Sequence, residues 1–138
     1  MKVIIDTNII LDVLSRREPH FETSAAILKF CGAQIIGFIT ASQTTDIFYL
    51  LRRDGKGSTE SKKIIQKLTD NIKIADVTTA DVKNALNSDM ADYEDALLAF
   101  AGKRQKAKHI VTRNKKDYEK SPIPAISPQM LIKQFFEG

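Results

Sequence analysis

The sequence predicts an α/β fold, a three-layer α/β/α sandwich around a mainly parallel sheet, built by a single domain over residues 1–138. Short apolar, β-branched runs alternate with helical patterns along the chain, and no long loop, linker or repeat interrupts this alternation. A chain of 138 residues that is 43% apolar is long enough to bury a sizeable core without a disulfide or a structural metal.

The strands are predicted from five short apolar or β-branched runs, which cover residues 2–5, 34–39, 72–74, 108–112 and 123–126. The first two are continuous apolar runs, as expected for strands buried on both faces. The last contains Pro124, which is best tolerated in an edge strand. It is therefore placed at the edge of the sheet.

Helices are predicted between these runs, where apolar residues recur at helical spacing, over residues 23–30, 42–53, 58–69, 79–86 and 92–106. Ser42 is the expected N-cap of the second helix. The helix over 92–106 has the clearest apolar pattern. Turn-forming residues at 54–57 and three prolines within 120–128 predict loops.

Several classes of site are excluded because their motifs are missing. The chain has no phosphate-binding P-loop, no Gly-x-Gly-x-x-Gly turn, no His-Glu-x-x-His pair and no Gly-x-Ser-x-Gly elbow. One cysteine and two distant histidines do not make a zinc set. The missing motifs argue against a nucleotide bound on backbone amides, against a zinc site and against a serine nucleophile.

The composition predicts a cytoplasmic protein. No apolar run approaches the ~20 residues that span a bilayer, and Asp6 comes too early for a signal peptide, so we expect no membrane association. The single Cys31 agrees with a reducing compartment. The net charge of +4 is modest and by itself indicates no partner.

Acidic and amide side chains occur at predicted strand ends or helix starts in four segments, as Asp6, Asp46, Asp92 with Asp95, and Asn114 with Asp117. Three of these segments have a local alternative, because Asp92 can cap a helix, Asp6 can form an Asx-turn and Asp117 can balance neighbouring lysines. Asp46 has none, because a charge among apolar neighbours needs a partner if it is buried. In open α/β sheets, however, ligands bind at the carboxyl ends of the strands. Carboxylates that converge there repel unless they share protons or bind a cation, and oxygen-only ligands select Mg²⁺ or Mn²⁺. Such a site suits phosphodiester hydrolysis.

Three segments resemble the PIN domain family, in particular VapC-type toxin ribonucleases: VIIDTNIILDVL at 3–14, DYEDAL at 92–97 and IVTRNKKDY at 110–118. The resemblance covers nearly the whole chain. It implies a PIN-like parallel-sheet fold and a divalent-metal-dependent endoribonuclease that cleaves RNA. It also implies the toxin of a toxin–antitoxin pair.

The resemblance also implies the site residues. The metal-binding and catalytic acids would be Asp6, Asp46, Asp95 and Asp117, with Asn114 completing the last segment and Asp92 assisting. The polar residues that orient these ligands would be Thr7, Asn8 and Thr112. Two positions depart from the family: Asp46 stands where glutamate is more common, and Asn114 stands where many members have an acid. We therefore expect a shorter reach at Asp46 and weak binding of a second metal.

Positive charge is concentrated in residues 103–120, which carry +6 and leave −2 for the rest of the chain. Within this segment Arg113, Lys115 and Lys116 are the expected contacts to RNA phosphates, and such contacts are independent of sequence. The charge does not distinguish RNA from DNA; the resemblance favours RNA.

The resemblance implies two protein partners, a small antitoxin that covers the pocket and a second copy of the chain in a homodimer. Apolar patterns at 64–68 and 131–136 could serve the dimer, although packing in the core also accounts for them. Two other functions stay open at this point. A non-catalytic PIN-like module that binds RNA or protein is suggested by Asn114. A phosphoacceptor receiver domain is disfavoured because no acidic pair ends the first strand.

Overall fold

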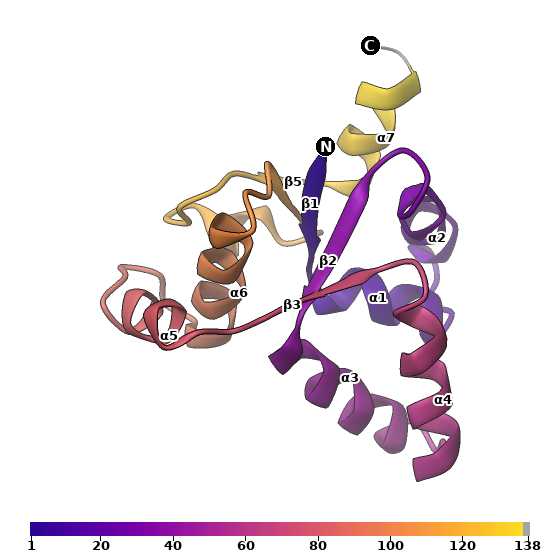
Figure 1. Ribbon diagram of the computed structural model, residues 1–138. Coiled ribbons are helices and arrows are strands. Elements are labelled where there is room, and N and C mark those ends of the chain that lie inside the picture. The colour runs from indigo at the N-terminus through magenta and orange to yellow at the C-terminus, as the bar shows by residue number, and fades with distance from the viewer. Residues whose placement is uncertain (137–138) are drawn as a thin grey trace.

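A parallel β-sheet forms the middle layer of the computed structural model, which describes residues 1–136 (Figure 1). Its strands are β1 (Lys2–Ile5), β2 (Ile36–Thr40), β3 (Lys73–Ala75), β4 (His109–Val111) and β5 (Ala125–Ile126). They lie in the order β3-β2-β1-β4-β5, and every neighbouring pair is parallel. β1 is therefore central, β5 is at an edge as expected, and all strands end on the same side of the molecule.

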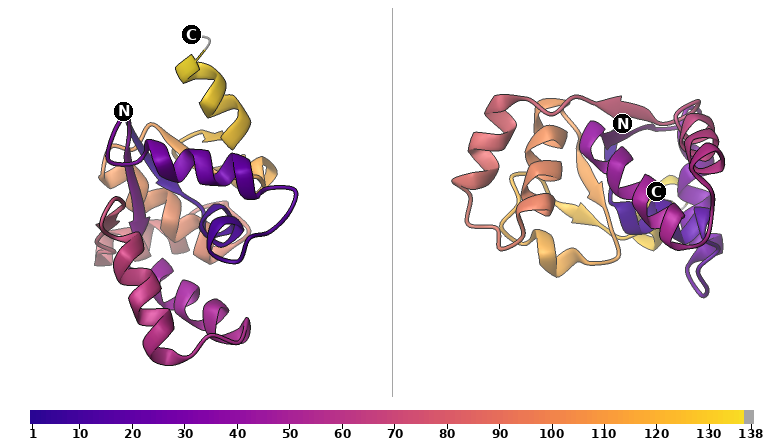
Figure 2. Two further views of the ribbon diagram at one scale, coloured as in Figure 1. Left: turned by 90° about the vertical axis from the view of Figure 1, so that its right-hand side faces the viewer. Right: turned by 90° about the horizontal axis from the view of Figure 1, so that it is seen from below.

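Helices cover both faces of the sheet. They are α1 (Thr7–Leu14), α2 (Phe21–Phe30), α3 (Ala41–Arg53), α4 (Ser58–Leu68), α5 (Thr79–Leu86), α6 (Tyr93–Arg104) and α7 (Pro128–Phe136), with a 3₁₀ turn η1 (Lys115–Tyr118) after β4. α5 and α6 lie on one side and α1, α2, α4 and α7 on the other, and the same layers are seen from below in Figure 2. The predicted three-layer α/β/α fold is confirmed.

The core has two halves because successive residues of a strand point to opposite faces. Val3 and Ile5 of β1 pack with α1, α2, α3 and α7, whereas Ile4 packs with α5 and α6. All three are fully buried. This explains why β1 is a continuous apolar run with no alternation.

Gly102 lets α6 approach β1 closely. A Cβ atom at this position would lie 2.8 Å from Cγ2 of Ile4, so only glycine fits without displacing that side chain. α6 runs from the carboxyl ends of the strands back across the sheet. Its first turn therefore lies beside Asp6, the residue that follows β1.

The start of α3 differs from the prediction. Thr40, not Ser42, is the N-cap: its Oγ1 accepts a hydrogen bond from the backbone N–H of Gln43 at 3.1 Å, and Oε1 of Gln43 accepts one from the N–H of Thr40 at 2.7 Å. The Thr-x-x-Gln spacing makes this reciprocal capping box possible. β2 consequently runs into α3 without a loop. The other four predicted helices begin and end within two residues of their predicted bounds.

No helix formed by residues 1–136 is both long enough and apolar enough to cross a bilayer.

Candidate active site

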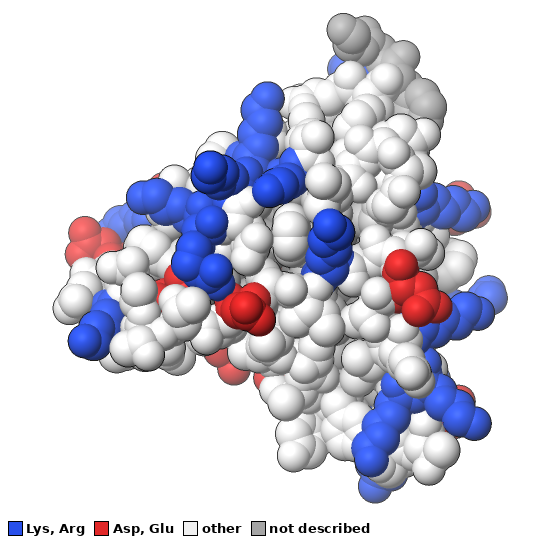
Figure 3. All heavy atoms as spheres, in the orientation of Figure 1, with Lys and Arg blue, Asp and Glu red and all other residues white. Residues whose placement is uncertain are grey.

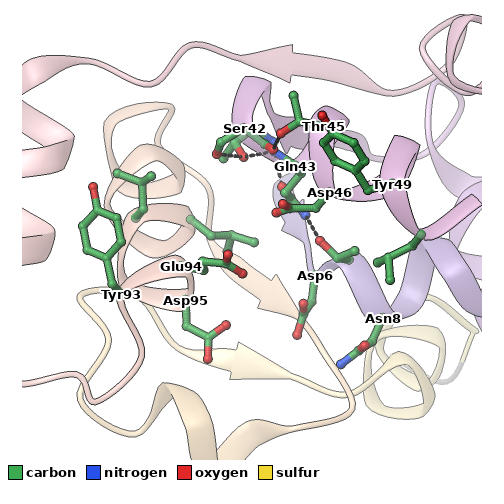
Figure 4. A pocket seen from close by; sticks show the side chains of 15 residues that line it. Asp6, Asn8, Ser42, Gln43, Thr45, Asp46, Tyr49, Tyr93, Glu94 and Asp95 are labelled. Atoms are coloured by element: carbon green, nitrogen blue, oxygen red, sulfur yellow. Dashed lines mark hydrogen bonds between the residues drawn. The ribbon is translucent and has the colours of Figure 1, made fainter. Parts of the chain in front are cut away.

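A cleft of about 650 Å³ opens at the carboxyl ends of the strands, between α3 and α6. Four carboxylates line it: Asp6 follows β1, Asp46 lies on α3, and Glu94 and Asp95 lie in the first turn of α6. Figure 4 shows Glu94 and Asp95 on one wall of the cleft and Asp46 on the other, with Asp6 below Asp46 and facing Asp95. Three separate segments of the chain thus bring their acids to one place.

Asp6 is held by the ends of β1 and β4. Its side chain is 9% exposed, and its Oδ2 accepts a hydrogen bond of 2.7 Å from Oγ1 of Thr112. Oγ1 of Thr112 also accepts from the backbone N–H of Asn114 at 3.0 Å, which orients this hydroxyl. Burial raises the pKa of Asp6, while the Thr112 bond and the backbone amides of Asn8 and Thr7 lower it in part.

Asp95 is half-buried beside Asp6. Burial raises its pKa from 3.8 to about 6, and the negative charges of Asp92, Asp6 and Asp117 add to the rise. The buried hydroxyl of Tyr118 donates a hydrogen bond to Oδ1 of Asp95 at 3.2 Å. The pKa of Tyr118 is raised by burial and by both Asp6 and Asp95, so this phenol remains a donor between the two acids.

Asp46 and Glu94 face each other from α3 and α6. The pKa of Glu94 is raised mainly by the negative charge of Asp46, then by burial and by Asp92. Asp46 and Glu94 therefore lie close enough to repel each other, and no ion pair found among residues 1–136 neutralises either of them.

Two of the three remaining predicted ligands, Asp92 and Asp117, line a neighbouring hollow of about 210 Å³ together with Lys116. Asp95 borders both cavities. Asp92 caps α6, because its Oδ1 accepts a hydrogen bond from the backbone N–H of Asp95 at 2.9 Å. The exposed Asn114 lines neither cavity. The structure therefore brings Asp6, Asp46 and Asp95 together and leaves Asp92 and Asp117 one step away.

The cleft suits a divalent cation by charge and by donor type. The ion pairs found among residues 1–136 join Arg104 to Asp81 and Arg113 to Asp12, so no basic side chain in this part of the chain neutralises the cleft acids. In the same residues no three His, Cys, Asp or Glu side chains are grouped to hold one ion. Mg²⁺, however, is commonly bound through one or two carboxylates and several waters. The adjacent pair Asp6 and Asp95 meets that requirement.

Comparison with known families decides the identity. The family model described as "PIN domain" matches residues 2–116. The chain belongs to the PIN domain family. No curated protein sequence matches it significantly.

Solved structures share the fold of this PIN domain at low sequence identity. VapBC-1 from nontypeable Haemophilus influenzae is 13% identical, with a TM-score of 0.70 over 94% of this chain and 99% of that one. A toxin–antitoxin complex from Klebsiella pneumoniae is 17% identical, with a TM-score of 0.69 over 91% and 97%. VapC20 from Mycobacterium tuberculosis, a sarcin-ricin loop cleaving toxin, is 11% identical, with a TM-score of 0.63 over 78% and 86%.

Arg113 of this PIN domain has a structural partner. Its Nε and Nη2 donate to Oδ2 and Oδ1 of Asp12 at 2.9 and 3.0 Å, and Oγ of Ser24 donates to Oδ2 of Asp12 at 2.9 Å. Asp12 is fully buried, so it needs this counter-charge. The Arg113 guanidinium, which the sequence predicted to contact RNA, therefore pairs with Asp12. Lys115 and Lys116 are exposed on η1.

The basic segment 103–120 is divided between the two ends of the sheet. Lys108 lies at the amino end, where its backbone N–H donates to the carbonyl of Lys2 at 2.8 Å, and α6 also ends on this side. Figure 3 shows Lys and Arg side chains gathered on this upper part of the molecule. Only the later part of the segment, with Lys116 and Lys120, lies beside the acids.

Three residues of the site were not identified from the sequence: Gln43, Glu94 and Tyr118. Gln43 is buried, and its Nε2 donates to the carbonyl of Ile5 at 2.8 Å and to Oγ1 of Thr7 at 3.1 Å, which ties α3 to the end of β1. The Thr-x-x-Gln capping spacing was a usable signal for Gln43. Glu94 and Tyr118 lie beside predicted ligands, but only the packing of α6 against η1 shows which way they point.

Proposed function

We propose that this PIN domain is a divalent-metal-dependent endoribonuclease of the cytoplasm and the toxin of a toxin–antitoxin pair. The observation that carries the proposal is the convergence of Asp6, Asp46, Glu94 and Asp95 on one cleft, with raised pKa values at three of them and no neutralising cation among residues 1–136. The carboxylates of such a site repel one another, and a bound Mg²⁺ or Mn²⁺ would neutralise that repulsion.

In this proposal Asp6 and Asp95 would hold the ion, and Asp46 and Glu94, which line the same cleft, would add to the negative charge around it. The bound ion would supply charge neutralisation at the phosphodiester and acidify a water molecule. Thr112 fixes the orientation of Asp6, as its hydrogen bond of 2.7 Å indicates.

Lys115 and Lys116 supply the phosphate contacts, because both are exposed on η1 beside the cavity that Asp117 lines. Asp117 extends the site on that side, and Asn114 acts through its backbone N–H, which orients the hydroxyl of Thr112. Asp92 supports it by capping α6.

The toxin role is supported by the fold relatives. The Klebsiella structure is a toxin–antitoxin complex, and the Mycobacterium protein is a toxin that cleaves the sarcin-ricin loop. The product of a short neighbouring reading frame is expected to bind the chain and inhibit it. The homodimer remains a prediction, tested by light scattering of the purified chain.

The direct test is cleavage of single-stranded RNA by the purified protein with Mg²⁺, with Mn²⁺ and with EDTA. Cleavage is expected only with a metal, and Asp6→Asn and Asp95→Asn are expected to abolish it. Asp70→Asn, an exposed turn residue outside both cavities, is the matched control and should retain full activity. RNA that stays intact with every metal, but is still bound, would instead indicate a non-catalytic PIN module.

A further inference from the structure

Two tyrosine rings are exposed at the mouth of the acidic cleft. Tyr49 on α3 is 70% exposed and Tyr93 at the start of α6 is 42% exposed, and both line the cleft. Within residues 1–136 neither hydroxyl forms a hydrogen bond. Large aromatic side chains that are left uncovered next to a functional site commonly mark a binding surface.

The two rings frame the acids. Tyr49 follows Asp46 by one helical turn, and Tyr93 directly precedes Glu94. Figure 4 shows the rings on opposite walls, with the carboxylates between them. A polymer held at the acids would therefore pass one ring on its way in and the other on its way out.

Tyr49 also lines a second cavity, of about 410 Å³ between α3 and α4, and it shares this place on both cavities with Thr45. Phe48 and Ile65 provide apolar surface in this groove, and Lys62 and Gln66 provide polar groups. Neither Lys62 nor Gln66 has a side-chain partner within residues 1–136.

The ring of Tyr49 packs against the neighbouring ring of Phe48. The two rings meet at 81° with 5.6 Å between centroids, an edge-to-face contact. Because Tyr49 is 70% exposed, much of its ring stays open to a flat ligand.

We propose that Tyr49 and Tyr93 stack on unpaired RNA bases on the two sides of the phosphodiester held at the acidic cleft. The strand continues past Tyr49 into the α3–α4 groove, where Lys62 contacts a phosphate. The proposal rests on the proposed ribonuclease function, and it adds the residues that bind the bases. Every base has a π face, so stacking recognises unpaired nucleotides with little dependence on sequence. The groove adjoins the cleft at Thr45 and Tyr49, and its Lys62 carries the charge that a phosphate needs, so RNA is the ligand that these two features favour.

The test measures binding of a fluorescently labelled single-stranded RNA by anisotropy, with Ca²⁺ in place of Mg²⁺ and a gel to verify that the RNA stays intact. Tyr49→Leu and Tyr93→Leu should each weaken binding by about 5- to 150-fold, since stacking contributes roughly 1–3 kcal/mol per base. Tyr49→Phe keeps the ring and should bind as the wild type does. Leu86→Ala is the matched control, because Leu86 is 68% exposed but lines neither cavity.

A second arm uses RNAs with one base removed at successive positions. In the wild type, one abasic position should weaken binding by about the same factor as Tyr49→Leu, and in Tyr49→Leu that position should have no further effect. Unchanged affinity in both leucine variants would overturn the proposal. Binding that depends on the rings without any cleavage in Mg²⁺ refutes only the ribonuclease function. Cleavage with unchanged KM in both variants refutes only the stacking.

Discussion

Replacing Asp95 by asparagine should stabilise the metal-free protein while removing its response to metal. Burial raises the pKa of Asp95 from 3.8 to about 6, so the folded state binds this proton more tightly than the unfolded chain does. Protonated Asp95 therefore contributes to the free energy of unfolding, and this contribution is fully present below about pH 4 and is lost as the pH rises through 6. At pH 7 the charged Asp95 therefore destabilises the metal-free fold.

The size of the expected stabilisation follows from the pKa of Asp95. A rise of this pKa from 3.8 to about 6 would amount to roughly 3 kcal/mol for a fully enclosed group. Because Asp95 is only half-buried, solvent screening reduces this to about 1–2 kcal/mol. Asp95→Asn keeps an oxygen that can accept the Tyr118 hydrogen bond, so little of this gain should be offset.

The assay is urea denaturation followed by far-UV circular dichroism, which suits a chain without tryptophan. In EDTA at pH 7 the free energy of unfolding should be about 1–2 kcal/mol higher for Asp95→Asn than for the wild type, and the difference should shrink toward zero near pH 4. A saturating Mn²⁺ concentration should stabilise the wild type by roughly 3 kcal/mol and the variant much less. Asp70→Asn should change stability by less than about 0.5 kcal/mol. A variant that is less stable than the wild type at pH 7 in EDTA would refute the assignment of Asp95 to an uncompensated acidic cleft.

Three further substitutions test separate parts of the structure. Arg113→Ala leaves the buried Asp12 unpaired and should lower the free energy of unfolding by about 3 kcal/mol in urea denaturation; an unchanged midpoint would contradict the ion pair. Tyr118→Phe removes the donor to Asp95 and should weaken Mn²⁺ binding by about tenfold in calorimetric titration with little loss of stability, whereas equal affinity would exclude a positioning role. Gly102→Ala forces a methyl group against a β1 side chain and should cost about 1–3 kcal/mol, and a neutral result would show that α6 can shift away.

The fold could be predicted from the sequence because its strands and most of its helices have strong local signals. β1 and β2 are apolar runs buried on both faces, and the helix over 93–104 has a long apolar pattern. The prediction of Ser42 as the N-cap of α3 is wrong, because a cap residue is favoured further by a partner three positions later. The reciprocal partner of Thr40, Gln43, decides the start of α3.

The site was predictable only in part. Asp6, Asp46 and Asp95 follow from strand ends and helix starts, which the topology brings to one edge of the sheet. The pairing of Arg113 with Asp12 joins residues about a hundred positions apart, and no local pattern reveals it. Side-chain directions of this kind depend on tertiary packing, which periodicity does not encode.

The central claim is that the acidic cleft binds a divalent cation. A crystal soaked in Mn²⁺ and measured at an anomalous wavelength tests it most directly. One anomalous peak is expected between the carboxylates of Asp6 and Asp95, and it should be absent from an Asp6→Asn crystal soaked in the same way. Ordered carboxylates with no peak between them, at a Mn²⁺ concentration that supports RNA cleavage, would contradict it.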